Sequence, residues 1–136
     1  MVKRRRGSRS APSRRSRHRP FEQLVDQAIA SIPMPFAAAL DEVAIVIEDE
    51  PTPEQLGEQG MSADDGLYGL YEGIPRTDWG ADGIPVPDRI VLFRLPLETD
   101  FPDPDELADE VWLTLVHELA HHLGIEEDRL AELGVD

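Results

Sequence analysis

The sequence predicts an α+β fold in a single domain, with a small mixed sheet of three or four strands backed by helices. A length of 136 residues suits one domain. Short runs of branched and aromatic residues alternate with segments in which apolar residues recur every three or four positions, which indicates strands and helices respectively. Charge is divided sharply along the chain: residues 1–20 hold nine Lys and Arg and no acid, whereas residues 21–136 hold the other four cations and all 28 acids. We therefore expect a basic arm over 1–20 and the folded domain over 21–136.

The arm has almost no apolar content, so it cannot bury enough surface to offset the entropy of ordering, and we predict that it is disordered. It also lacks the apolar stretch of a secretory signal. Weak, salt-dependent contact with nucleic acid or another polyanion is one interpretation of its arginines. Because no aromatic residue is interleaved with them to stack on bases, we favour a solubilising extension, or one that folds transiently against the acidic domain.

Four segments in the first part of the domain have readable patterns. Residues 21–32 place apolar side chains on one helical face, and prolines follow directly. The run Val43–Ile47 is uniformly apolar and predicts a buried strand. A polar loop follows, with one helical turn expected at Thr52–Gly57, and Leu67–Tyr71 alternates weakly enough to predict a short strand.

The next part of the chain combines a long loop with the clearest strand. Gly73–Asp88 contains repeated Gly and Pro, which prevents regular structure, and a loop of this length often lines a substrate cleft. Trp79 and Tyr71 could contact substrate there or cap an edge of the core. Arg89–Leu95 is rich in branched and aromatic residues and predicts a strand that ends at Pro96.

A long helix follows, and both of its ends are legible. Asp103 is a typical N-cap residue and Pro104 suits the first helical position. Gly124 is the residue type that ends a helix in the left-handed conformation. Between them, apolar residues recur every four positions and should pack on the sheet, at Leu107, Val111, Leu115, Leu119 and Leu123. A shorter helix, Glu126–Leu133, is expected to pack back through Leu130 and Leu133.

The same helix carries a candidate metal site near the end of the chain. His117 and His121 are four residues apart, so both imidazoles share one helical face and can point at one ion. Glu118 lies about 100° further round, where a carboxylate could take a proton from a metal-activated water. The chain contains no cysteine, so any metal must be held by His, Asp or Glu. We expect His122 to bond a backbone group or face solvent.

The motif, read as HExxHxxGxx followed by an acid, resembles the zincin metallopeptidases. The stretches 67–75 and 87–93 extend this resemblance to the small, single-domain bacterial family known as minimal zincins, over about residues 21–136. The resemblance implies a zinc ion held by His117, His121 and Glu127, with Asp128 as the alternative third ligand. It implies Glu118 as the general base, and a peptide or protein substrate added as a strand beside residues 67–71 or 89–95.

Several functional alternatives stay open at this stage. Tyr68 and Tyr71 are both candidates for stabilising the oxyanion. An inactive regulatory or binding module derived from a zincin is the main rival to a zinc peptidase, and a polyanion-binding protein acting through the arm is the third reading. The absence of cysteine suits a reducing compartment, so we expect a cytoplasmic protein, and no apolar run is long enough to cross a membrane. Homodimerisation is left open.

Overall fold

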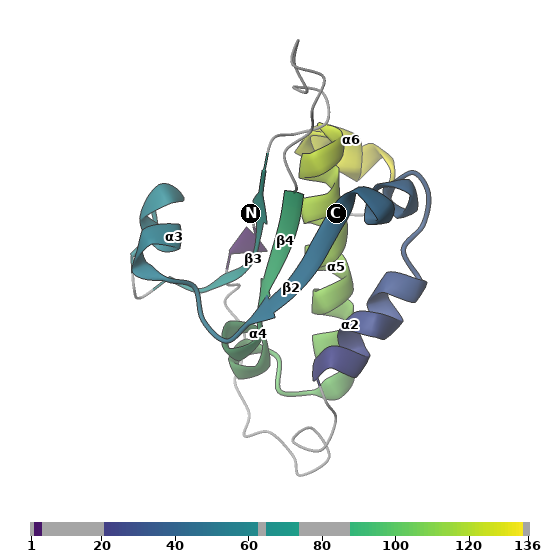
Figure 1. The fold of residues 1–136 in the computed structure, drawn as a ribbon. Coiled ribbons are helices and arrows are strands. Elements are labelled where there is room, and N and C mark those ends of the chain that lie inside the picture. Colours follow the sequence, from purple (N-terminus) through teal and green to yellow (C-terminus); the bar gives the residue numbers. More distant parts are fainter. Residues whose placement is uncertain (1, 4–20, 63–64, 74–87, 135–136) are drawn as a thin grey trace.

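A computed structural model describes residues 2–3, 21–62, 65–73 and 88–134 of the chain. Its centre is a four-stranded sheet in the order β1-β3-β4-β2 (Figure 1). The strands are β1 (Val2–Lys3), β2 (Val43–Glu48), β3 (Leu67–Glu72) and β4 (Asp88–Phe93). Strand β2 runs parallel to β4, whereas β3 is antiparallel to both β4 and β1. The prediction of a mixed sheet in an α+β domain is confirmed.

Strand β4 is the centre of the sheet, and β2 is one of its edges. Residues Ile90 to Phe93 of β4 are fully buried because neighbours cover both sides of the strand and both of its faces. Strand β2 was predicted to be buried, yet its residues are half-buried and Ala44 is exposed. The apolar run Val43–Ile47 is therefore an edge strand that packs on the core through one face.

Two helices cover one face of this sheet (Figure 1). They are α2 (Phe21–Ala30) and α5 (Pro104–Leu123), both at the positions that the apolar spacing predicted. Four of the five predicted stripe residues of α5 are buried in the main core, and Leu123 packs partly buried against it. Burial of this stripe fixes the rotation of α5 about its own axis, and so determines which of its side chains face the sheet edge.

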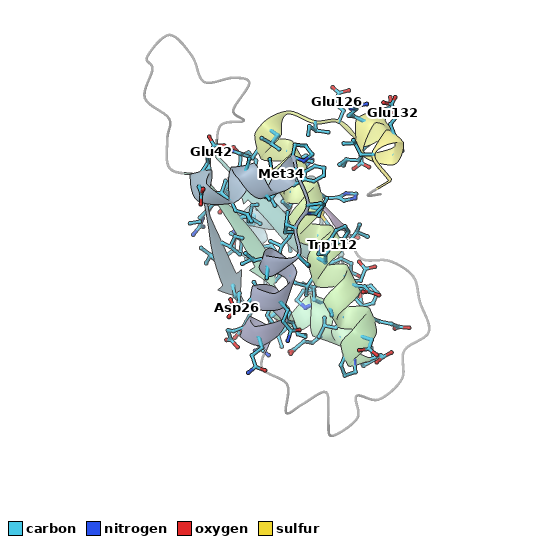
Figure 2. All side chains as sticks on the ribbon, turned by 90° about the vertical axis from the view of Figure 1, so that its right-hand side faces the viewer. Asp26, Met34, Glu42, Trp112, Glu126 and Glu132 are labelled. Carbon is cyan, nitrogen blue, oxygen red and sulfur yellow. The ribbon has the colours of Figure 1, made fainter. Side chains whose placement is uncertain are left out.

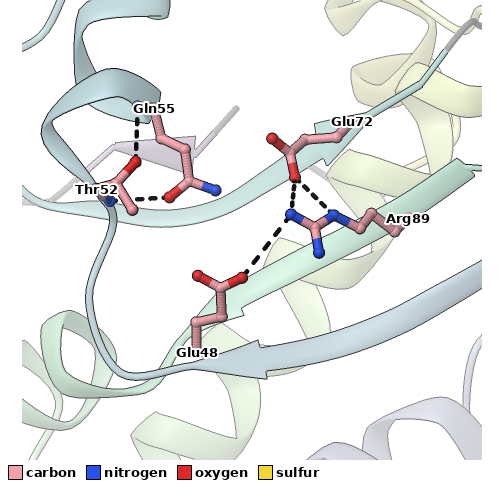
Figure 3. A network of polar contacts seen from close by, with 5 residues as sticks. All are labelled: Glu48, Thr52, Gln55, Glu72 and Arg89. Atoms are coloured by element: carbon pink, nitrogen blue, oxygen red, sulfur yellow. Dashed lines mark hydrogen bonds and ion pairs between the residues drawn. The ribbon is translucent and has the colours of Figure 1, made fainter.

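The opposite face carries a smaller apolar cluster formed by Leu56, Leu67, Leu70, Val91 and Phe93. Leu56 comes from α3 (Pro53–Glu58), a short helix whose capping box pairs the side chains of Thr52 and Gln55 with each other's backbone N–H groups (Figure 3). On this side Arg89 of β4 reaches both neighbouring strands, at 2.7 Å from Glu72 and 3.9 Å from Glu48 (Figure 3). These side chains tie β2, β4 and β3 together.

Two helical segments were not predicted. Residues Phe36–Glu42 form the 3-10 helix η1, and Arg94–Asp100 form α4, so the strand expected to reach Leu95 stops at Phe93. Pro96 lies in the first turn of α4, where the missing N–H costs no helical hydrogen bond. The guanidinium of Arg94 holds this turn through ion pairs with Asp49 and Glu98.

Val2 and Lys3 form a strand in a segment for which the sequence predicted no regular structure. They pair with Gly69 and Leu67, so β1 lies on the outer edge of β3. Residues 4–20, which carry the rest of the predicted basic arm, lie outside the described residues. In the part of the chain that the structure describes, no helix is both long enough and apolar enough to span a membrane.

Candidate active site

The candidate site lies in the last two turns of α5, between the predicted cap signals. The Asp103 carboxylate accepts the backbone N–H of Asp105 at 3.3 Å, and Gly124 adopts the left-handed conformation at φ 74°. The Ile125 N–H then donates to the carbonyl of Ala120, which turns the chain out of the helix. This turn leads into α6 (Glu127–Glu132), in which Leu130 is buried as predicted but Leu133 is exposed.

The two histidines of the motif occupy successive turns of α5 and differ in exposure. The side chain of His117 is 16% exposed and that of His121 is 46% exposed. The Nε2 atom of His117 is buried and makes no hydrogen bond within the described residues. A buried ring nitrogen with no partner costs free energy unless something binds it, and an imidazole nitrogen is a preferred zinc ligand. The unpartnered Nε2 of His117 is therefore one donor atom that fits zinc.

The predicted third ligand lies next to His117. Oε1 of Glu127 is 3.6 Å from Nδ1 of His117, and the Glu127 side chain is 71% exposed. Asp128, the alternative, is also exposed. Over the described ranges, no three His, Asp or Glu side chains converge into a set that could hold a metal ion as they stand. Closing the site around an ion therefore requires rotation of the exposed side chains.

Glu118 is fully buried, and its carboxylate faces both the helix and strand β3. Its Oε1 accepts the backbone N–H of Tyr71 at 2.8 Å and lies 3.4 Å from Nδ1 of His121. Burial alone would raise the pKa of Glu118, but hydrogen bonding, chiefly with His121, and nearby positive charge outweigh it and lower the pKa below its usual value. A lowered pKa favours the ionised form of the carboxylate, which is the form that can accept a proton.

Neither tyrosine that the sequence offered as an oxyanion donor has a free hydroxyl. Tyr68 is fully buried, and its hydroxyl donates to Asp100 at 2.7 Å. The hydroxyl of Tyr71 donates to Asp88, also at 2.7 Å. Burial, the hydrogen bond to Asp88 and the charge of that carboxylate all raise the pKa of Tyr71. Both hydroxyl protons are therefore engaged by carboxylates of the protein.

His122 does not face solvent, which was one of the two environments predicted for it. It is fully buried, with Nδ1 2.9 Å from Oδ2 of Asp88 and Nε2 3.4 Å from Oε1 of Glu42. Glu42, at the end of η1, lies at the same end of the molecule as the C-terminal turn of α5 (Figure 2). Asp88 and Glu42 were not singled out from the sequence, because both are far from the motif along the chain and no local pattern marks them.

Of the two strands expected to bind a peptide, β3 is the better candidate, because β4 is paired along both of its edges. Strand β4 lies between β3 and β2, so both of its edges are paired. Among the described residues, β3 pairs with β4 on one side and with the two residues of β1 on the other. Residues 74–87, with Trp79 and most of the loop predicted to line the cleft, lie outside the described residues.

Comparison with known proteins agrees with this geometry. The model of a family described as zincin-like metallopeptidase matches residues 40–135, which include β2, β3, β4 and the whole of α5. No curated protein matches the chain.

Proposed function

Since the chain belongs to the zincin-like metallopeptidase family, we propose that it is a zinc-dependent peptidase in which Glu118 is the general base. The observation that carries this proposal is the placement of Glu118, a carboxylate with no exposed surface, beside a histidine and a sheet edge. Burying a charged carboxylate costs free energy. Such groups with a perturbed pKa concentrate where chemistry requires them.

His117 and His121 would hold the zinc ion through ring nitrogens, and Glu127 would supply the carboxylate, with Asp128 as the alternative. When bound, the ion would supply Lewis acidity to a water molecule and to the carbonyl of the scissile bond. The exposed Glu127 side chain can rotate at little cost, since it is not packed in the core. His117 is the more constrained ligand, because its ring is mostly buried.

Glu118 would take the proton from the water oxygen as that oxygen bonds to the peptide carbonyl carbon. The carbon–nitrogen bond then breaks, and Glu118 returns the proton to the leaving amine. The Tyr71 N–H holds one carboxylate oxygen during both transfers. A fixed oxygen limits the orientations of the carboxylate and so favours the one that meets the water.

The outer edge of β3 is the proposed binding site for an extended peptide. Backbone N–H groups alternate between the two sides of a strand, so Leu67 and Gly69 present theirs on the same side as Tyr71. Leu67 and Gly69 are the partners of β1, which already pairs there antiparallel. The edge therefore leads along β3 to the residue whose N–H holds Glu118, and a peptide substrate would approach the general base along it.

One observation favours the rival function, a binding or regulatory module without turnover. The side chains of the candidate ligands are not gathered into a set of three within the described residues. In this alternative the same β3 edge would bind a partner segment, and Glu118 would have no proton to transfer. Zinc affinity separates the two functions, because the module needs no zinc and the peptidase does.

The test is zinc content by elemental analysis together with cleavage of an unbiased peptide library. We expect zinc near one per chain in the wild type and in Glu118→Gln, with cleavage in the wild type alone. Glu118→Gln keeps the side-chain oxygen that accepts the Tyr71 N–H, so the fold should be retained. A wild type that binds no zinc after supplementation at neutral pH would rule out the peptidase and leave the binding module.

A further inference from the structure

Tyr71 contacts α5 at two points one helical turn apart. Its backbone N–H donates to Oε1 of Glu118 at 2.8 Å, and its hydroxyl oxygen is 3.2 Å from Nδ1 of His122. Glu118 and His122 are four residues apart, so their side chains lie on the same face of the helix. The turn between these two contacts contains His121, one of the proposed zinc ligands.

Asp88 connects the two halves of this arrangement. Its Oδ2 accepts the Tyr71 hydroxyl at 2.7 Å and lies 2.9 Å from Nδ1 of His122. Asp88 opens β4, and its side chain is 1% exposed, as is appropriate for a carboxylate held by two partners. Gly73 packs directly against this carboxylate, because a β-carbon at position 73 would overlap it. Asp88 is thus confined from the β3 side and the α5 side.

The far nitrogen of His122 is also occupied. Nε2 lies 3.4 Å from Oε1 of Glu42, so the ring spans the gap between η1 and β4. His122 has no exposed surface and therefore contacts neither solvent nor an incoming substrate. A ring held at both nitrogens has little rotational freedom, and its backbone is part of the turn that carries the motif.

We propose that Tyr71, Asp88 and His122 act as positioning residues for Glu118, and we call these three residues the Tyr71 clamp. The clamp fixes the position of the Glu118–His121 turn along β3 and its rotation about the axis of α5. It thereby fixes the direction of the Glu118 carboxylate. The inference rests on the proposed peptidase function for its kinetic consequences, but its structural consequence at the Tyr71 N–H is independent of catalysis. A small misplacement of a catalytic group can cost a large factor in rate.

A purely structural role for the same hydrogen bonds predicts a different result. Buried polar networks stabilise folds whether or not they serve a site. Tyr68 supplies the matched control, because it lies on the same strand, is buried, and donates its hydroxyl to a carboxylate at the same distance of 2.7 Å. Its acceptor, Asp100, ends α4, so the bond does not reach the turn of α5 that carries Glu118.

The experiment compares full-length wild type with Tyr71→Phe, Asp88→Asn and Tyr68→Phe. For each we would measure zinc content, kcat and KM for one peptide, thermal stability, and hydrogen exchange at the residue-71 amide by NMR. In Tyr71→Phe and Asp88→Asn we expect kcat to fall about tenfold, the factor that corresponds to the net free energy of one hydrogen bond. KM and zinc content should be unchanged. The residue-71 amide should exchange faster in both.

Tyr68→Phe should lower thermal stability while leaving kcat and the residue-71 amide unchanged. Equal effects of Tyr68→Phe and Tyr71→Phe on kcat would overturn the clamp in favour of a general structural role. An unchanged amide exchange rate in both Tyr71→Phe and Asp88→Asn would also overturn it. If the wild type cleaves nothing, the proposed function fails, and the amide exchange still decides whether the clamp exists. Should Tyr71→Phe not fold, Asp88→Asn supplies the same readouts.

Discussion

Gly69 of β3 lies so close to α5 that a β-carbon at this position would be 2.5 Å from Cγ2 of Thr114. Thr114 is fully buried, so its methyl group cannot move out of the way into solvent. The strand that leads to Tyr71 and the helix that carries Glu118 therefore pack with no side chain between them at this point. Their separation, on which the hydrogen bond from Tyr71 to Glu118 depends, is set by a glycine.

Gly69→Ala is expected to destabilise the protein by about 1–3 kcal/mol, because the added methyl group overpacks the contact with Thr114. Gly57→Ala is the control, since a β-carbon there meets nothing within 4 Å and the position is inside α3. That substitution should stabilise the protein by about 0.5–1 kcal/mol. Urea denaturation of both variants measures the two effects, and a Gly69→Ala variant as stable as wild type would contradict the packing.

Glu127→Ala should weaken zinc binding by more than about tenfold, whereas Asp128→Ala should leave it close to wild type. The reason is that the exposed Glu127 side chain lies close to His117, with Oε1 3.6 Å from Nδ1, so rotation of that side chain can bring its carboxylate to an ion bound by the histidine. Competition with a chromogenic chelator gives both affinities. The opposite ranking of the two variants would assign the third ligand to Asp128.

Val2→Pro should increase kcat/KM for an added peptide by about fivefold, because proline removes the N–H by which β1 can pair with β3. Val2 lies opposite Gly69 on the edge proposed for substrates, so the N-terminal strand competes for that edge. Val2→Thr is the control, since it keeps both the N–H and the branched β-carbon. Any tag belongs at the C-terminal end of the variants, and an unchanged kcat/KM in Val2→Pro would mean that β1 does not compete.

Above pH 10, the stability of the wild type should fall more steeply with rising pH than the stability of Tyr71→Phe. The folded state raises the pKa of Tyr71, through burial and the hydrogen bond to Asp88. The unfolded chain therefore releases this proton first, near the ordinary tyrosine pKa of about 10. The stabilisation is complete below that pH and is lost as pH rises. Thermal melts of both proteins from pH 8 to 11 test this, and parallel curves would contradict it.

The elements with regular apolar spacing were predictable from the sequence, and those whose form depends on tertiary partners were not. The extent of α5 follows from Asp103, Pro104 and Gly124, which act locally through capping and backbone preference. Helix α4 was missed because its first turn is held by Arg94 pairing with Asp49, a residue 45 positions away. The helix propensity of a segment depends on its own residues and does not reflect a contact with a residue so far away in the sequence.

The same distinction applies to the candidate site. The spacing of His117, Glu118 and His121 depends only on helical geometry, so it could be predicted, and the helix is present as expected. The partners of His122 could not, because Glu42 lies 80 residues earlier in the chain and Asp88 meets the ring only once β4 is seated in the sheet. For the same reason no sequence pattern indicated that the backbone of Tyr71 holds Glu118.

Every strand of the sheet precedes α5 in the chain. During synthesis the surface that receives the helix is therefore made before the helix itself, and a nascent chain that still lacks α5 contains none of the residues proposed to bind zinc or transfer protons. The buried Glu118 adds a second condition, since its carboxylate meets the Tyr71 N–H only when helix and strand have docked. If the proposed peptidase function holds, hydrolytic capacity would therefore appear only with the finished fold.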